Sequence, residues 1–361
     1  MGRIVSRWRQ PVNERGRGPA SAAGALALSL VLFPGPLAAA PVLQWPAACT
    51  AGEDCWVVNY VDTDPREGAS RDFTCGGQTY DGHSGTDIAI RDWAALERGV
   101  DVLAAAAGRV LRTRDGVEDR DPTEEERRRL LEENRGCGNG VLIEHEGGWQ
   151  TLYCHMKRGS IAVRPGDSVE AGRKIGQVGQ SGNAEFPHLH LDVTRGGEAV
   201  DPFTGAAAKE GCGHKGTPLW APGTGAGYEP VSFYAAGFAD RRPDFDRLRR
   251  DAGTPETLPA EAGALTFWVA FFGAAQGDRI RMEISGPDGK VFASEDITQE
   301  KNRARQFYFI GRRARGGLAP GVYRGSAVLV RALPDGTRIE RSITRRVTVG
   351  ERGARSGTGG T

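Results

Sequence analysis

The chain has 361 residues, which is more than one hydrophobic core usually organises, so we expect two folded domains. Its 47 Lys and Arg residues balance 46 Asp and Glu residues, leaving a net charge of +1. This balance gives no electrostatic reason to expect a nucleic-acid partner, and it does not identify any other class of substrate.

The first 40 residues have the pattern of a signal peptide. Arginines between Arg3 and Arg17 precede the apolar run 22–33, and the small residues 38–40 follow. We therefore expect an exported protein, periplasmic or extracellular, with no stable membrane span after cleavage. The apolar run is shorter than the roughly 20 residues that cross a bilayer, and an uncleaved membrane anchor is the alternative. Pro41 leaves the cleavage position open.

An exported chain exposes its cysteines to an oxidising compartment, so disulfides are their expected state. Cys49 and Cys55 are close enough in sequence to pair with each other, and the remaining four cysteines allow three pairings. A structural zinc site built from Cys154, Cys212 and His214 is an alternative, although it lacks a Cys-x-x-Cys pair. The cysteines are Cys49, Cys55, Cys75, Cys137, Cys154 and Cys212.

Residues 41–217 contain short alternating runs separated by Gly, Pro and Asp, which predict an antiparallel β domain. Within it, 140–155 reads as a hairpin that turns at 146–148. Strand alternation predicts that the last four odd-numbered side chains of this hairpin share one face. These residues are Trp149, Thr151, Tyr153 and His155.

A charged insertion covers residues 112–136. Thr123 and Glu126 have the spacing of a capping box, which predicts a short helix over 124–134 that ends at Gly136. We interpret it as a solvated surface helix. The alternative is that it forms a wall of a substrate groove.

The Pro- and Gly-rich segment 218–229 predicts a linker, and 230–350 predicts a small Ig-like β-sandwich. No His or Cys follows His214, so we expect an accessory module, and a candidate docking site for a cell-wall or divisome partner. The tail 351–361 is Gly-rich and expected to be disordered. The candidate strands are 265–272, 279–285, 306–310, 322–331 and 338–349.

Two short histidine motifs carry the candidate chemistry. In His83-Ser-Gly-Thr-Asp87, a bend leads into a strand on which Asp87 faces away from its apolar neighbours. In His188-Leu-His190, the two imidazoles share a strand face about 7 Å apart. With His155, four of the six histidines fall in these places, which favours one shared metal site.

These motifs resemble those of the lysostaphin-type, or LytM-domain, zinc metallopeptidases, a family of peptidoglycan endopeptidases. The resemblance covers roughly 81–203 and includes the stretches 83–89, 151–155 and 179–190. It implies an all-β fold, in which an antiparallel LytM-type peptidase domain precedes the sandwich. The cysteines, Cys154 beside His155 among them, and the charged insertion depart from the family pattern.

The resemblance also implies one zinc ion per chain, held by His83, Asp87 and His190. His155 and His188 would then act on the substrate, a peptide stem of peptidoglycan, while water attacks the carbonyl that zinc polarises. His188 is the candidate general base, and His155 is the candidate for oxyanion stabilisation or proton transfer to the leaving amine. The sequence does not separate the two roles.

Two other functions compete with this interpretation. Some LytM-type domains lack metal ligands and act as non-catalytic regulators or binding proteins of other cell-wall hydrolases, but here all five polar positions are present. An extracellular β-sandwich adhesin would leave the His and Asp set unexplained.

Overall fold

The computed structural model of the chain describes residues 39–333 and 336–351. The expected signal peptide up to residue 38, two residues of an expected turn (334 and 335) and the expected disordered tail from residue 352 lie outside the described residues. Within the described ranges we find no helix whose length and apolar content would let it span a bilayer.

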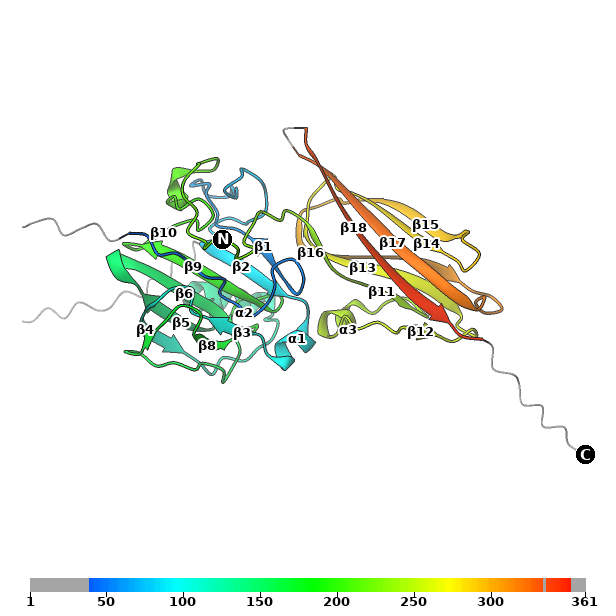
Figure 1. Cartoon of the computed structure of the whole chain (residues 1–361), viewed down its shortest axis with the longest axis horizontal. Helices are drawn as coiled ribbons and strands as arrows, with labels where there is room; N and C mark the ends of the chain where they lie inside the picture. The colour runs from blue at the N-terminus through cyan, green and yellow to red at the C-terminus, as the bar shows by residue number, and fades with distance from the viewer. Residues whose placement is uncertain (1–38, 334–335, 352–361) are drawn as a thin grey trace, which may run out of the picture.

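The regular secondary structure of the described chain is mostly β-strand with a few short helices, so the all-β prediction is confirmed. The two halves lie side by side along the long axis (Figure 1). The strands of the first half are β1 (Cys55–Asn59), β2 (Gly85–Ile90), β3 (Asp101–Leu103), β4 (Gly108–Arg114), β5 (Asn139–Glu144), β6 (Trp149–Met156), β7 (Ser168–Val169), β8 (Lys174–Gln177), β9 (His188–Arg195) and β10 (Glu198–Ala199). Its helices are α1 (Trp93–Arg98) and α2 (Glu124–Glu132), with 3-10 turns at Glu146–Gly148 and Ala208–Glu210.

The main sheet of this half has the order β1-β2-β9-β6-β5-β4-β7, with β10 paired to β9, and its pairs are antiparallel. A separate two-stranded sheet joins β3 to β8. The predicted hairpin is confirmed as β5 and β6. Alternation along β9 buries Leu189 and Leu191 in the core and leaves His188 and His190 on the opposite face.

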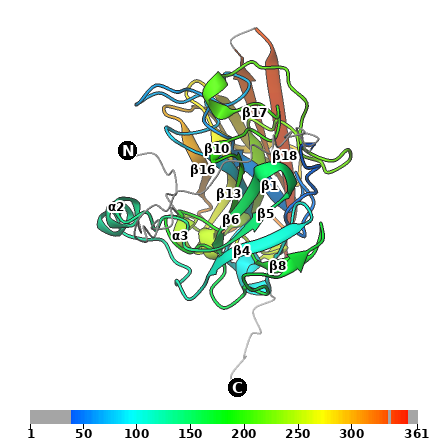
Figure 2. The ribbon, with the colours of Figure 1, turned by 90° about the vertical axis from the view of Figure 1, so that its left-hand side faces the viewer.

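The predicted helix of the charged insertion is confirmed as α2, which protrudes at the side of the first half (Figure 2). Thr123 accepts a hydrogen bond from the backbone of Glu126, and the Glu126 carboxylate accepts from the backbone of Thr123, which completes the capping box. The helix has no buried residue, as expected of a solvated helix. It ends at Glu132, earlier than predicted.

The second half is built from two sheets, β11-β13-β16 and β12-β18-β17-β14-β15, that enclose a common apolar core. Every predicted strand of this half is present, while β11, β12, β15 and α3 were missed. Whether this two-sheet domain is Ig-like stays a prediction. Its elements are β11 (Ser232–Ala239), α3 (Phe245–Arg250), β12 (Thr257–Leu258), β13 (Ala264–Ala274), β14 (Arg279–Ser285), β15 (Val291–Thr298), β16 (Arg303–Arg313), β17 (Gly321–Ala332) and β18 (Arg338–Val349).

The two halves share a third apolar cluster. Trp56 of β1 and Ala89 of β2 pack there with Trp268 and Phe272 of β13. Trp56 is paired with Ala89, and Ala89 with His188, so these side chains project from one face of the sheet. The second half therefore covers part of the face that carries the histidines.

The segment 218–229, predicted as a linker, packs on the first half. Leu219 and Trp220 belong to the core of that half, where the backbone of Trp220 forms a bridge to Leu43. Tyr228 lies against Tyr60, with ring centroids 5.2 Å apart. This packing fixes where the second half attaches.

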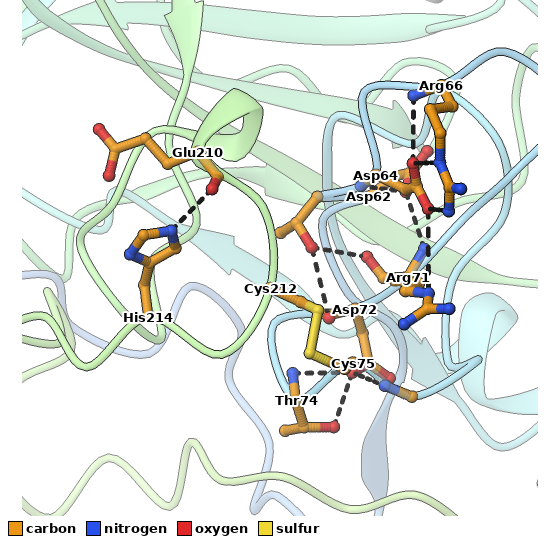
Figure 3. Close-up of a disulfide and its surroundings, with 12 residues drawn as sticks. Asp62, Asp64, Arg66, Arg71, Asp72, Thr74, Cys75, Glu210, Cys212 and His214 are labelled. Atoms are coloured by element: carbon orange, nitrogen blue, oxygen red, sulfur yellow. Dashed lines mark hydrogen bonds and ion pairs between the residues drawn. A yellow bond between two sulfur atoms is a disulfide. The ribbon is translucent and has the colours of Figure 1, made fainter.

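Three disulfides are present among the described residues: Cys49–Cys55, Cys75–Cys212 and Cys137–Cys154. The first is the predicted pair. Because Cys154 and Cys212 pair with different partners, the alternative of a structural zinc site at Cys154, Cys212 and His214 is wrong. Figure 3 shows Cys75–Cys212 joining the loop after β1 to the segment after β10, where His214 contacts only the backbone carbonyl of Glu210 among the residues drawn.

Replacing Cys137 and Cys154 together by Ala is expected to lower the free energy of unfolding by about 3 kcal/mol, because the bond closes a loop of 17 residues. The double variant is also expected to lower the peptidase activity that the sequence predicts. The backbone N–H of His155, a candidate catalytic residue, donates to the Cys137 carbonyl over 2.8 Å, so losing the disulfide would disturb the position of His155. Urea unfolding and an activity assay check both effects. The Cys49/Cys55 double variant is the control, and an equal loss of activity in that control would contradict the second expectation.

Candidate metal centre and active site

Strand pairing brings the two motifs together. In the antiparallel pair of β2 and β9, Asp87 lies directly opposite His190, and Ala89 lies opposite His188. Ile88 and Ile90 point into the core, so Asp87 faces the other way, as predicted. His83 precedes β2 in a turn closed by a bond from its backbone N–H to the Tyr80 carbonyl, 3.0 Å long.

Three ligand-type atoms meet at this position. His83 Nε2 lies 3.1 Å from Asp87 Oδ1 and 3.2 Å from His190 Nδ1, while His190 Nδ1 lies 2.8 Å from Asp87 Oδ1. All three residues are buried, and their side chains form a group able to hold a metal ion. The structure thus brings together His83, Asp87 and His190, the ligands expected from the sequence.

Hydrogen bonds behind these residues fix which ring nitrogen is available. His83 Nδ1 donates to the Tyr60 carbonyl over 2.6 Å, which leaves the Nε2 lone pair directed into the site. His190 Nε2 lies 2.9 Å from Asp192 Oδ1, which leaves Nδ1 for a ligand. Asn59 donates to Asp87 Oδ2 over 2.8 Å and so orients Oδ1 toward the histidines.

Asp192 was missed in the sequence. It lies two residues beyond His190 on β9 and is buried, so the alternation that placed both histidines on one face could have placed Asp192 there as well. The absence of a side chain at Gly85 leaves space for the contact between His190 and Asp192. A Cβ at Gly85 would lie 2.7 Å from His190 Nε2 and 2.9 Å from Asp192 Oδ1, so only glycine allows this close contact.

His155 and His188 lie beside the three ligand-type residues. Their ring centroids are 4.6 Å apart, and the His155 ring lies 5.8 Å from that of His190. His155 Nδ1 donates to the Ser181 carbonyl over 2.8 Å, and His188 Nδ1 donates to the Phe186 carbonyl over 2.8 Å. In the neutral form of each ring Nε2 is therefore the unprotonated nitrogen, and His188 Nε2 lies 3.6 Å from Asp87 Oδ1.

The prediction that His155 shares a face with Tyr153 is wrong. Trp149 and Tyr153 point into the core, and the Tyr153 hydroxyl accepts from the Ala105 backbone over 2.7 Å. His155 has a φ of 59°, in the left-handed region that a residue other than glycine seldom adopts. This turn of the backbone breaks the strand alternation and directs the imidazole to the face that carries His188 and His190.

Burial and charge act in opposite directions at this site. Burial alone would lower the pKa of His190, but the carboxylates of Asp192 and Asp87 outweigh it and raise the pKa to about 10. Burial would raise the pKa of Asp87, but the neighbouring His83 and His188 bring it well below its usual value. Burial lowers the pKa of both His155 and His188, which favours neutral rings at pH 7.

The buried carboxylates of Asp87 and Asp192 need a positive charge nearby to offset the cost of their burial. Among the described residues, Asp87 and Asp192 form ion pairs only with histidines, and no Lys or Arg lies within 4.0 Å of either. A buried carboxylate without a positive partner is costly, so a proton or a metal ion at His190 Nδ1 and His83 Nε2 stabilises the cluster.

The remaining histidines lie elsewhere. His145 is buried, and its ring nitrogens contact the Ala107 carbonyl and the Thr151 hydroxyl, which is a structural role. His214 is exposed. The sequence assigned neither residue to the site.

Two grooves lie next to the site. One of about 560 Å³ opens at His83, between the loop 62–67 and the segment 197–199. Tyr80 is 44% exposed, and its ring lies against that of His83, with centroids 4.5 Å apart. A second groove, of about 480 Å³, begins at Phe186, whose ring lies 5.0 Å from that of His188.

The sequence model of Peptidase family M23 matches residues 81–202, which contain all five site residues. The chain is 39% identical over 69 residues to the DD-carboxypeptidase/endopeptidase Mpg of Neisseria meningitidis, covering 19% of this chain and 15% of that protein. It is 38% identical over 65 residues to the peptidoglycan DD-endopeptidase ShyB of Vibrio cholerae, covering 18% and 15%. The chain thus spans about 15% of the length of these relatives.

Among solved structures, the catalytic domain of the prophage-encoded M23 protein EnpA from Enterococcus faecalis is 25% identical to this chain, with a TM-score of 0.27. The match covers 40% of this chain and 90% of that domain.

Proposed function

Because this chain carries a domain of peptidase family M23 at residues 81–202, we propose that it is a zinc metalloendopeptidase that hydrolyses the peptide cross-links of bacterial peptidoglycan. The observation that carries the proposal is the buried cluster of His83, Asp87 and His190 with two further imidazoles beside it. The similar proteins include the peptidoglycan DD-endopeptidase ShyB of Vibrio cholerae, which supports the substrate class.

The donor set fits zinc. Nitrogen and carboxylate ligands bind zinc at about 2.0 to 2.2 Å, so tetrahedral ligand atoms lie about 3.3 Å from one another. The three atoms here lie 2.8 to 3.2 Å apart, and a small outward shift accommodates the ion. Bound zinc would supply a Lewis acid that polarises the scissile carbonyl and lowers the pKa of a water molecule.

The other two histidines would do the proton chemistry. His188 Nε2 lies 3.6 Å from Asp87 Oδ1 and carries no proton when the ring is neutral, so it is our candidate for the base that takes a proton from the attacking water. His155 is held by the bond from its Nδ1 to the Ser181 carbonyl, and we assign it to stabilising the oxyanion or handing a proton to the leaving amine. In either role its Nε2 first takes up a proton, which the attacking water supplies. Both rings are buried, which supports the neutral state that a base requires.

We also propose that the protein acts outside the cytoplasm. Its three disulfides are typical of oxidising compartments, and the first 40 residues have the composition of a signal peptide.

The proposal is tested by incubating the purified, zinc-loaded chain with defined cross-linked muropeptides and analysing the fragments by mass spectrometry. We expect about one zinc per chain and release of the individual stems, and the fragment masses identify the bond that is cut. Full activity in a metal-free protein would contradict the zinc assignment. Zinc-loaded protein that cleaves no muropeptide, yet activates a separate cell-wall hydrolase, would favour the regulator.

Asp192→Asn is expected to weaken zinc binding by about 10- to 100-fold, because the carboxylate that orients His190 and increases its basicity is lost. Competition against a fluorescent chelator measures the affinity. Turnover is expected to recover at saturating zinc, since no reacting group is removed. An unchanged affinity would mean that Asp192 does not support the ligand.

A further inference from the structure

The second half of the chain reaches the edge of the active site. The Phe186 ring lies 5.0 Å from that of His188 and 5.8 Å from that of Phe272, which belongs to β13. A single aromatic side chain therefore separates a site histidine from the second domain. The groove of about 480 Å³ starts at this ring and runs between the two halves.

Positive charges line this groove from three elements. They are Arg127 of α2, Arg249 of α3, and Arg303 and Arg305 of β16, against the carboxylates of Asp121 and Glu185. Arg127 is paired with Asp121, so that carboxylate is already neutralised. Arg249 lies 3.8 Å from Asp246, at an exposed position where an ion pair is weak. The groove thus has an excess of positive charge.

Arg305 is held in an unusual environment. Its guanidinium carbon lies 5.4 Å from the centre of the Phe186 ring and 5.6 Å from that of the Phe307 ring. Burial lowers its pKa, although Glu185 and Tyr234 partly oppose this effect. No ion pair among the described residues includes Arg305, although the Tyr234 hydroxyl and the carboxylates of Glu185 and Asp121 are near enough to act on its charge. A half-buried cation in this position is stabilised by an incoming anion.

We propose that the interdomain groove binds a carboxylate of the peptide stem, with Arg305 as the anchoring cation, so that the second domain forms part of the substrate site. The inference rests on the proposed function. The planar fork of arginine suits a carboxylate, which it binds through two parallel hydrogen bonds. The phenylalanine walls exclude water from that contact and leave an apolar surface for the aliphatic part of the stem.

The placement gives the groove a role in specificity. Phe186 links it to His188, so a stem anchored at Arg305 would extend toward the histidines. Arg127 comes from the charged insertion, which supports the alternative that this segment forms a wall of a substrate groove. The second domain would then select acidic stems rather than serve only as a docking module.

Binding is measured by isothermal titration calorimetry on the full chain stripped of metal with a chelator, so that neither cleavage nor metal coordination contributes. The probes are the soluble stem tetrapeptide with free carboxylates and the same peptide with every carboxylate amidated. The variants are Arg305→Gln and Arg305→Lys. Arg324→Gln is the matched control, because Arg324 is exposed on β17 of the other sheet of the second domain.

We expect amidation and Arg305→Gln each to weaken binding by about 10-fold or more, the effect of losing one charge-assisted pair. The affinity of Arg305→Lys for the acidic peptide should lie between those of Arg305→Gln and the unchanged chain. Arg324→Gln should bind that peptide as tightly as the unchanged chain does. Equal binding of the two peptides, no binding of either, or equal effects of Arg305→Gln and Arg324→Gln would overturn the proposal. If Arg305→Gln fails to fold, the comparison of the two peptides on the unchanged chain still tests whether the chain binds a stem carboxylate.

Failure of this inference is distinguishable from failure of the proposed function. A chain that cleaves muropeptides but binds both peptides equally has the activity without the subsite. A chain that prefers the acidic peptide but cleaves no muropeptide has the subsite without the activity.

Discussion

Asp87→Ala is expected to abolish metal binding and to lower turnover by about a thousandfold or more. Asp87 Oδ1 is the atom that contacts both His83 and His190, and its loss leaves two neutral imidazoles to hold the ion. The Lewis acid is worth several kcal/mol of transition-state stabilisation, and each 1.4 kcal/mol corresponds to about tenfold in rate. Metal content by mass spectrometry and release of muropeptide fragments measure the two losses.

Glu170→Ala is the control for this variant, because it removes an exposed carboxylate from a turn of the same domain. Circular dichroism establishes that Asp87→Ala is folded, since the change also removes the acceptor of the Asn59 side chain. Retention of one tightly bound zinc in Asp87→Ala would contradict the ligand assignment, whatever happens to turnover.

His155→Ala is expected to keep the metal and lose turnover by about 10²- to 10⁴-fold, the usual contribution of a positioned proton-transfer or oxyanion-stabilising group. The His155 ring lies 5.8 Å from that of His190, so its removal leaves the three ligand-type atoms in place. The measurement is zinc stoichiometry together with the rate of muropeptide cleavage under saturating zinc.

His214→Ala provides the matched histidine control, because His214 is exposed and contacts only a backbone carbonyl among the described residues. It should retain both zinc and turnover. Loss of zinc from His155→Ala would instead assign His155 to the ligand set, and full turnover would remove it from the chemistry.

The positions of the three candidate metal ligands could be predicted because they follow from short-range rules. The bend before Asp87 and the two-residue period of His188 and His190 set their directions within single strands, and antiparallel pairing then brings Asp87 opposite His190. The same two-residue period predicts that Asp192 shares the face of His188 and His190, so the sequence could have identified it as well. The capping box of α2 is equally local, since Thr123 and Glu126 are three residues apart.

The rest depends on long-range contacts or on backbone exceptions. Cys75 and Cys212 are 137 residues apart, and spacing alone cannot separate their pairing from the alternatives. The docking of the second domain on the histidine face arises from Trp56 and Trp268 packing into one cluster, which no local pattern encodes. Strand alternation gave the wrong face for His155, because a positive φ at a residue other than glycine leaves no trace in the hydrophobic pattern.

At His155 the left-handed backbone conformation lowers the stability of the fold, while the imidazole that it positions is expected to be needed for turnover. Such a conformation costs on the order of 1 to 3 kcal/mol outside glycine, and asparagine tolerates it better than histidine does. His155→Asn is therefore expected to melt at a higher temperature while losing turnover. Selection of variants for heat resistance alone would therefore enrich inactivating substitutions at residue 155. Stabilisation of this protein should keep His155 unchanged.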